Sequence, residues 1–201
     1  LHTAYRRQRQ MCIRDSPFTE KEKAGRAEYA RMLEVNEMLG HVEIPRIGQD
    51  LPIYAGTTDE VLEKGCGHLE GTSLPIGGDN THTVITGHRG LPNAKLFRNL
   101  DQLVEGDVFY IHNIEGTLAY QVDKIQVVDP SDFNPIMVEK GHDYATLLTC
   151  TPYMINSHRL LVRGHRIAYQ EAIDDGVANS KRLAPDLSLI HISEPTRRYA
   201  I

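Results

Sequence analysis

The sequence predicts a mainly β protein, a closed or nearly closed barrel of about eight strands with a few short helices. Seven to nine short segments are rich in β-branched residues or alternate apolar with polar residues. Glycine and proline separate these segments at close spacing, as in turns between neighbouring strands. Helical spacing is confined to residues 19–39, 60–64 and 93–103.

The composition is that of a globular protein with a single core. The chain has 201 residues, of which 40% are hydrophobic and 24% charged, and its net charge is −5. A negative charge argues against a nucleic-acid partner, because phosphate binding needs a basic surface. No apolar run reaches the roughly 18 residues of a membrane span, so we expect no anchor in this chain.

The two ends of the chain differ in character from the rest. Residues 1–16 and 187–201 share no pattern with their neighbours and resemble translated sequencing-adapter reads; disordered tails are the alternative. Setting them aside as one sets aside a fusion scar leaves three parts. We expect an N-terminal helical segment over residues 17–40, a barrel over 41–170 and a C-terminal extension over 171–186.

The first elements follow from capping and turn residues. Thr19 and Glu22 form a capping box, which predicts a helix that runs to about Leu39 and ends at Gly40. Two short strands are predicted next, over residues 41–47 and 51–55. Thr57, Thr58 and Asp59 then cap a brief helix that ends at Gly65.

The later elements are mostly strands. A β-branched strand is predicted over residues 81–86, followed by helical spacing through Leu96, Leu100 and Leu103. Segments 107–112 and 117–128 predict a hairpin, and the alternation slips at Lys124, which indicates a bulge. Strands over 144–149 and 160–168 complete the set.

The three cysteines are Cys12, Cys66 and Cys150. Their odd number and wide spacing argue against a disulfide framework, and without a Cys-x-x-Cys pair we expect no structural zinc and no cofactor. Cys12 lies in the foreign N-terminal segment. Cys66 is interpreted as a small buried residue, because free cysteine is among the most buried residue types.

Cys150 is the candidate nucleophile. Taken alone, it too would be interpreted as a buried structural residue. It ends an apolar, β-branched run, however, and Pro152 prevents that run from continuing as an inner strand. The thiol is therefore expected at the rim of the barrel, where a substrate has access.

His88 and Arg159 supply the complementary chemistry. His88 follows a β-branched strand and is flanked by Gly87 and Gly90; beside a thiol, its imidazole takes a proton and later protonates a leaving amine. Arg159 stands at the entrance of the last strand, where a fixed guanidinium donates hydrogen bonds to a substrate carbonyl or an oxyanion. Arg163 and Arg166 are weaker candidates for this role, because they fall later in the strand.

The stretch TLLTCTPYMINSHRLLVRG is accompanied by HVEIPRIGQDLPIYAGT, GHLEGTSLP, HTVITGHRGLPNAKLF and LAYQVDKIQVVDP. Together these five stretches resemble one family, the pilin-polymerising class C sortases of Gram-positive bacteria, whose signature corresponds to TLLTC in the first stretch. The resemblance covers residues 17–169. The family's catalytic histidine, cysteine and arginine fall on His88, Cys150 and Arg159.

The resemblance implies a sortase-type β-barrel and a cysteine transpeptidase. Such an enzyme cleaves an LPxTG-like sorting signal between threonine and glycine through a thioacyl intermediate, and transfers it to a lysine amine of a pilin subunit. It implies a location on the extracellular face of the cytoplasmic membrane. The alternative within the family is a housekeeping sortase that attaches surface proteins to peptidoglycan.

The match departs from the class C pattern at the N-terminus. Class C sortases often carry a lid that is anchored by an Asp-Pro-aromatic motif. Here Pro17 and Phe18 are present, but Ser16 stands in place of the aspartate, and Asp15 comes one position too early. We assign Phe18 as the lid aromatic and do not assign Asp15.

Two interpretations outside the family have less support from the sequence. Ten histidines raise the possibility of a metal-binding module, but no pair has the compact spacing of a metal site. A non-catalytic binding barrel is opposed by the intact cysteine, histidine and arginine. For His68, His82 and His158 we expect structural roles rather than substrate contacts.

Overall fold

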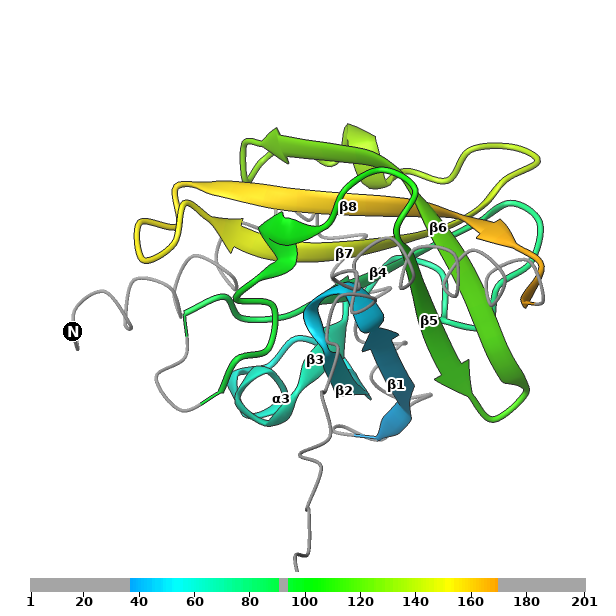
Figure 1. The fold of residues 1–201 in the computed structure, drawn as a ribbon, viewed down its shortest axis with the longest axis horizontal. Coiled ribbons are helices and arrows are strands. Elements are labelled where there is room, and N and C mark those ends of the chain that lie inside the picture. Colours follow the sequence, from blue (N-terminus) through cyan, green and yellow to red (C-terminus); the bar gives the residue numbers. More distant parts are fainter. Residues whose placement is uncertain (1–36, 91–93, 170–201) are drawn as a thin grey trace, which may run out of the picture.

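Eight strands close into a barrel in the part of the chain that the computed structural model describes, residues 37–90 and 94–169 (Figure 1). In chain order they are β1 (Met38–Ile44), β2 (Gln49–Ala55), β3 (Cys66–His68), β4 (Thr81–Thr86), β5 (Val108–Asn113), β6 (Gly116–Val128), β7 (Asp143–Thr151) and β8 (His158–Ile167). The described helices are short, namely α3 (Asp59–Lys64) and the 3-10 turns η1 (Pro45–Ile47), η2 (Leu100–Gln102) and η3 (Asn134–Ile136). The predicted mainly β barrel of about eight strands is confirmed.

Around the barrel the strands follow the order β1-β2-β3-β4-β7-β8-β6-β5, and β5 pairs with β1 to close it. β4 and β7 are parallel, and β7 and β8 are antiparallel. The carboxyl ends of β4 and β7 and the amino end of β8 therefore meet at one rim. This topology brings together segments that are far apart in the sequence.

The core fixes which side chains face outward. Ile85, Leu147 and Val162 are neighbours across β4, β7 and β8, and all three are buried in the core. Successive side chains of a strand point to opposite faces. The alternate positions of β7, including Thr146 and Cys150, therefore lie on the face away from the core.

Local predictions for α3 and the bulge are confirmed. The Thr58 hydroxyl accepts a hydrogen bond from the Val61 amide at the start of α3, and Gly65 ends the helix. The pairing of β6 with β8 shifts register between Val122 and Lys124, where the alternation of apolar residues slips in the sequence.

The prediction of a helix reaching Leu39 and ending at Gly40 is wrong at its end. Met38 and Leu39 already belong to β1. Gly40 has a φ of 149°, and a Cβ there would overlap the carbonyl of His112 on the neighbouring β5. Glycine is thus required for close strand pairing rather than for ending a helix. The same strand ends earlier than predicted, at Ile44, because Pro45 begins η1.

The helical spacing predicted over residues 93–103 is also not realised as a helix. The described residues of this segment form turns and the single 3-10 turn η2. Leu96, Leu100 and Leu103 are nevertheless buried. The three leucines pack an irregular connection against the core. Periodicity alone does not distinguish such a connection from a helix.

Several predictions lie outside the described residues. They are the terminal segments 1–16 and 187–201, the extension 171–186, the helical segment up to residue 36, and the assignments for Cys12, Asp15, Ser16, Pro17 and Phe18.

Candidate active site

Cys150 and Arg159 are direct neighbours on adjacent strands. Cys150 is the penultimate residue of β7, Arg159 is the second residue of β8, and their Cα atoms are paired in the antiparallel ladder. Side chains of paired residues project from the same face of a sheet, with Cβ atoms about 4.5–5.5 Å apart. The Arg159 side chain thus leaves the sheet beside that of Cys150.

His88 lies on the opposite side of Cys150 from Arg159, beyond the end of β4. The parallel register of β4 and β7 ends with Thr86 opposite Leu148. The alignment continues beyond it, because the Gly87 amide donates to the Leu148 carbonyl (3.1 Å) and the Thr149 hydroxyl donates to the Gly87 carbonyl (2.7 Å). Extending the register by two residues sets His88 beside Cys150. The three predicted residues thus form one row at neighbouring strand ends, with Cys150 in β7, Arg159 in β8 and His88 two residues beyond β4.

The row is screened from bulk water. His88, Cys150 and Arg159 are 6%, 2% and 8% exposed. The Arg159 Nη1 donates to the backbone carbonyls of Asn156 (3.4 Å) and His158 (3.2 Å), so the connection between β7 and β8 wraps around the guanidinium. Charged donors held in a site of low water content interact strongly with a developing negative charge.

The connection between β7 and β8 has a defined shape. The Ile155 and Asn156 amides both donate to the Pro152 carbonyl, at 3.1 and 2.9 Å. Asn156 is buried and has a φ of 60°, a left-handed conformation that asparagine tolerates better than most residues. This turn places the Asn156 carbonyl where Arg159 binds it, so the arginine is held in position before any substrate arrives.

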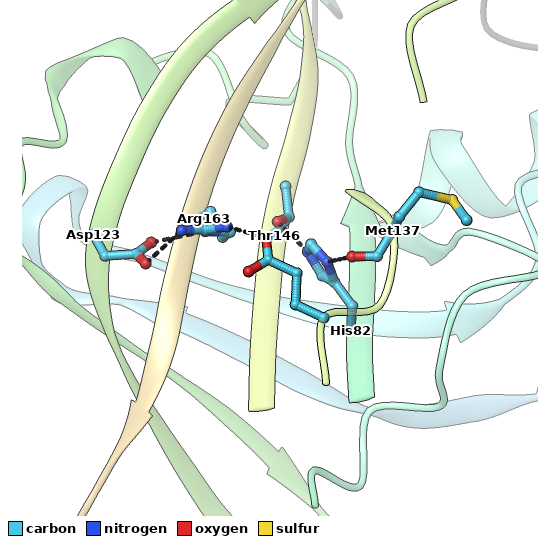
Figure 2. Close-up of polar contacts among 6 residues, drawn as sticks. His82, Asp123, Met137, Thr146 and Arg163 are labelled. Carbon is cyan, nitrogen blue, oxygen red and sulfur yellow. Dashed lines mark hydrogen bonds and ion pairs between the residues drawn. The ribbon is translucent and has the colours of Figure 1, made fainter. Parts of the chain in front are cut away.

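A polar network lies further along the same outward face, shown in Figure 2. Thr146 precedes Cys150 by four residues, which is about 13 Å along a strand. Arg163 of β8 binds Asp123 through two nitrogens, Nε at 3.1 Å and Nη2 at 2.8 Å, and binds Glu139 through Nη1 at 3.1 Å. Arg163 is therefore committed to carboxylates of the protein itself.

His82 joins this network to the segment that precedes β7 (Figure 2). Its Nδ1 lies 3.0 Å from the Met137 carbonyl, and its Nε2 lies 2.7 Å from the Thr146 hydroxyl. Since a carbonyl only accepts, Nδ1 carries the proton and Nε2 accepts from Thr146. The neutral ring satisfies both partners, and together with the Arg163–Glu139 ion pair it fixes the segment that contains Met137 on the sheet.

The other two histidines for which structural roles were expected also bind the protein itself. The Nε2 of His68 lies 2.8 Å from the Ser73 carbonyl and 3.1 Å from the Thr72 hydroxyl. The Nδ1 of the exposed His158 lies 2.8 Å from the Ser157 hydroxyl. The contacts of the buried His68 fit a structural role, and the role of His158 stays a prediction.

We expect the protein to lose stability when the pH falls from 7.5 to 5.5. Burial lowers the pKa of both His68 and His82 below the usual 6.5, opposed in each case by a backbone hydrogen bond and, for His82, by the nearby Asp123 and Glu139. The unfolded chain therefore binds more protons than the native state between the folded and unfolded pKa values. The stability contributed by each neutral ring is complete above pH 6.5 and is lost progressively below it, at up to about 1.4 kcal/mol per pH unit.

Thermal unfolding monitored by circular dichroism across this pH range measures the effect. The slope of melting temperature against pH should be smaller in His82→Gln than in the wild type. Equal slopes in the wild type and in the His68→Gln/His82→Gln double variant would contradict the assignment.

Cys66 is excluded from the site by its position. It is buried in the core on β3, and burial raises the pKa of its thiol. The thiolate is the reactive form of cysteine, so this residue is inert at neutral pH.

Iodoacetamide should therefore modify Cys150, which lies at the end of β7, much faster than Cys66 in the core of the native protein. Labelling of Cys66 requires unfolding of the barrel, which suppresses its rate by about 10³-fold or more. Peptide mapping by mass spectrometry distinguishes the cysteines, and labelling in urea provides the control in which Cys66 reacts. Equal labelling of the two residues in the native protein would show that the core assignment is wrong.

Arg89 directly follows His88 but has no role in the site predicted from the sequence. The available signal was a charged residue beside a candidate catalytic histidine. The structure shows it buried, with its side chain turned to other segments of the protein.

The described part of the chain contains neither a cluster of metal ligands nor a helix that could span a membrane. Among residues 37–90 and 94–169 there is no group of three or more histidine, cysteine or acidic side chains arranged to hold a metal ion. None of the helices in those ranges has the length and apolar character needed to cross a bilayer.

The chain is similar to known proteins over this same region. A family model described as a sortase domain matches residues 42–167. Sortase D of Bacillus subtilis (strain 168) is 31% identical over 137 residues, covering 67% of this chain and 66% of that protein. Sortase A of Bacillus anthracis is 26% identical over 132 residues, covering 66% and 61%. The chain thus spans about two thirds or less of the length of these curated relatives.

Solved structures give a closer match. Sortase C1 from Streptococcus suis has 58% identity and a TM-score of 0.70, covering 83% of this chain and 94% of that one. A pilus-related sortase C of Group B Streptococcus has 49% identity and a TM-score of 0.67, covering 85% and 98%. Sortase C of Streptococcus pneumoniae has 51% identity and a TM-score of 0.67, covering 82% and 97%. The resemblance to class C sortases is confirmed, and the chain belongs to the sortase family.

Proposed function

We propose that this protein is a cysteine transpeptidase that assembles pili. It cleaves an LPxTG-like sorting signal between threonine and glycine and transfers the threonine carbonyl to a lysine amine of a pilin subunit. The observation that carries this proposal is the pairing of Cys150 with Arg159 at the ends of β7 and β8, with His88 just beyond the adjacent end of β4. The pilus class is supported by identities of 49–58% to sortases C.

The first half-reaction forms the thioacyl enzyme. The Cys150 thiolate attacks the threonine carbonyl carbon, and Arg159 donates hydrogen bonds to the oxyanion of the tetrahedral intermediate. The carbon–nitrogen bond then breaks, the electron pair leaves with the glycine nitrogen, and protonated His88 gives that nitrogen its proton. The products are a thioester on Cys150 and a free amino-terminal glycine.

The second half-reaction reverses these roles. A lysine amine attacks the thioester carbon, Arg159 again binds the oxyanion, and His88 accepts the proton from the amine. The carbon–sulfur bond breaks and the Cys150 thiolate is restored. The product is an isopeptide bond, and one amide has been exchanged for another without net hydrolysis.

Mass spectrometry of the protein with an LPxTG peptide tests the proposal. We expect an adduct on Cys150 with the mass of the acyl fragment that ends at threonine, and we expect hydroxylamine to remove it. A non-cleavable peptide with a reduced threonine–glycine bond is the matched control. Absence of the adduct at saturating peptide would contradict the proposal.

The preferred acceptor amine distinguishes pilus assembly from the housekeeping alternative. We expect the thioacyl enzyme to react faster with a pilin-derived lysine peptide than with a peptidoglycan stem peptide. The opposite preference would favour attachment of proteins to the cell wall. On either acceptor, the site of action proposed here is the extracellular face of the cytoplasmic membrane, where these substrates occur.

A further inference from the structure

Arg89 is a buried arginine with every nitrogen of its guanidinium in use. The residue is 6% exposed. Its Nη1 donates to the Thr151 hydroxyl (2.8 Å), its Nη2 lies 2.6 Å from the Asp101 carboxylate, and its Nε donates to the Arg98 carbonyl (3.3 Å). A planar guanidinium bound at all three nitrogens has almost no freedom to rotate or shift.

These contacts join the two segments that carry the thiol and the imidazole. Arg89 directly follows His88, and Thr151 directly follows Cys150. The third segment is the irregular connection between β4 and β5, which supplies Arg98 and, within η2, Asp101. The backbone of the same connection binds the histidine segment again, because the Phe97 amide donates to the His88 carbonyl at 3.1 Å.

The hydrogen bond from Arg89 to Thr151 links two segments and does not neutralise the charge of the guanidinium. A buried guanidinium needs an opposite charge, which Asp101 supplies. The Thr151 hydroxyl is neutral, so it contributes little to stabilising the charge. The hydrogen bond instead connects the end of β7 to the segment that follows β4, which ends at Thr86.

We propose that Arg89 is a positioning residue that fixes the separation of the His88 imidazole and the Cys150 thiol through its bond to Thr151. The proposal rests on the function proposed above. Proton transfer between the two groups requires about 2.6–3.2 Å between heavy atoms. A misplacement of about 1 Å in an active site costs on the order of 10²-fold in rate. The strand ladder alone does not hold His88, since it lies two residues beyond β4.

A positioning role predicts a specific kinetic pattern. Arg89 is buried and its guanidinium binds the protein itself, so its removal should leave peptide binding nearly unchanged and slow the chemical steps. In Arg89→Met, which keeps the length of the side chain, we expect kcat to fall at least tenfold and KM to change less than twofold. Arg89→Lys should be intermediate, because a single ammonium does not reproduce the three contacts of the fork.

Thr151→Val tests the link itself. It removes one hydroxyl and keeps the shape of the side chain, and we expect a loss of kcat in the same direction as in Arg89→Met. The double variant should be no slower than Arg89→Met alone, because both changes break one bond. Arg166→Met is the matched control; it removes an arginine that binds Asp143 at the opposite end of β7, and its kcat should stay within twofold of the wild type.

A second readout needs no peptide. The rate of Cys150 alkylation against pH reports how closely the imidazole assists the thiol, and we expect this profile to move to higher pH in Arg89→Met and Thr151→Val but not in Arg166→Met.

If wild-type protein forms no thioacyl adduct, the proposed function fails while the alkylation profile still tests Arg89. Wild-type kcat and an unchanged profile in Thr151→Val, or strictly additive losses in the double variant, would overturn the proposal. Should Arg89→Met fail to fold, as judged by its melting temperature, Thr151→Val decides.

Discussion

Replacing Cys150 with alanine is expected to abolish cleavage of LPxTG peptides, with a loss of at least about 10⁴-fold in kcat/KM. The sulfur atom forms the covalent intermediate, and neither His88 nor Arg159 provides a substitute nucleophile. Cys66 cannot replace it, because it lies in the core and burial raises the pKa of its thiol. Release of the glycine-containing fragment, followed by liquid chromatography, measures the loss.

Two variants control for structural damage. Cys150→Ser replaces one sulfur atom with oxygen and keeps the shape of the side chain, so it should fold like the wild type while losing nearly all activity, since a hydroxyl is a far weaker nucleophile at neutral pH. Cys66→Ala should retain activity with a lower melting temperature, because it leaves a small cavity in the core. Substantial cleavage by Cys150→Ala would place the nucleophile elsewhere.

The row of His88, Cys150 and Arg159 could be predicted because the sequence pattern indicates where strands end. Cys150 precedes Thr151 and Pro152, which stop a strand, and His88 follows a β-branched run. Parallel strands that end together expose their last residues at one rim. Sequence patterns identify such ends, but the order of strands around a barrel depends on pairings between distant segments.

Other features depend on contacts between segments and left no local signal. β3 has only three residues, too few for an alternating pattern, and it exists because it pairs with both β2 and β4. Gly40 resembled a helix end because glycine serves there and in close strand pairing alike. The Arg89–Thr151 bond spans 62 residues of sequence, and no spacing rule predicts it.

The second large effect is expected for Arg159. In Arg159→Met we expect kcat to fall by about 10²–10³-fold, the loss seen when a preorganised oxyanion donor is removed. The Asn156 and His158 carbonyls hold the guanidinium beside Cys150, so it needs no reorganisation when the oxyanion forms. Single-turnover formation of the thioacyl enzyme measures this step directly.

Arg163→Met is the internal comparison, because Arg163 lies four residues further along β8 on the same face of the strand. Its guanidinium already binds Asp123 and Glu139, so it is not available to a substrate oxyanion. We expect its loss to lower stability and to change the rate of thioacylation less than fivefold. Equal rate losses in Arg159→Met and Arg163→Met would mean that the general positive charge of this face, rather than a placed donor, assists the reaction.

Arg159→Lys separates charge from geometry. A lysine keeps the positive charge but lacks the planar fork, which binds two carbonyls while it donates to a third oxygen. Because the oxyanion exists only in the transition state and the intermediate, loss of its donor lowers kcat and leaves KM nearly unchanged. We therefore expect Arg159→Lys to recover less than a tenth of wild-type kcat at an unchanged KM. Recovery of most of the activity by lysine would show that charge alone is sufficient, and a raised KM with normal kcat would assign Arg159 to substrate binding.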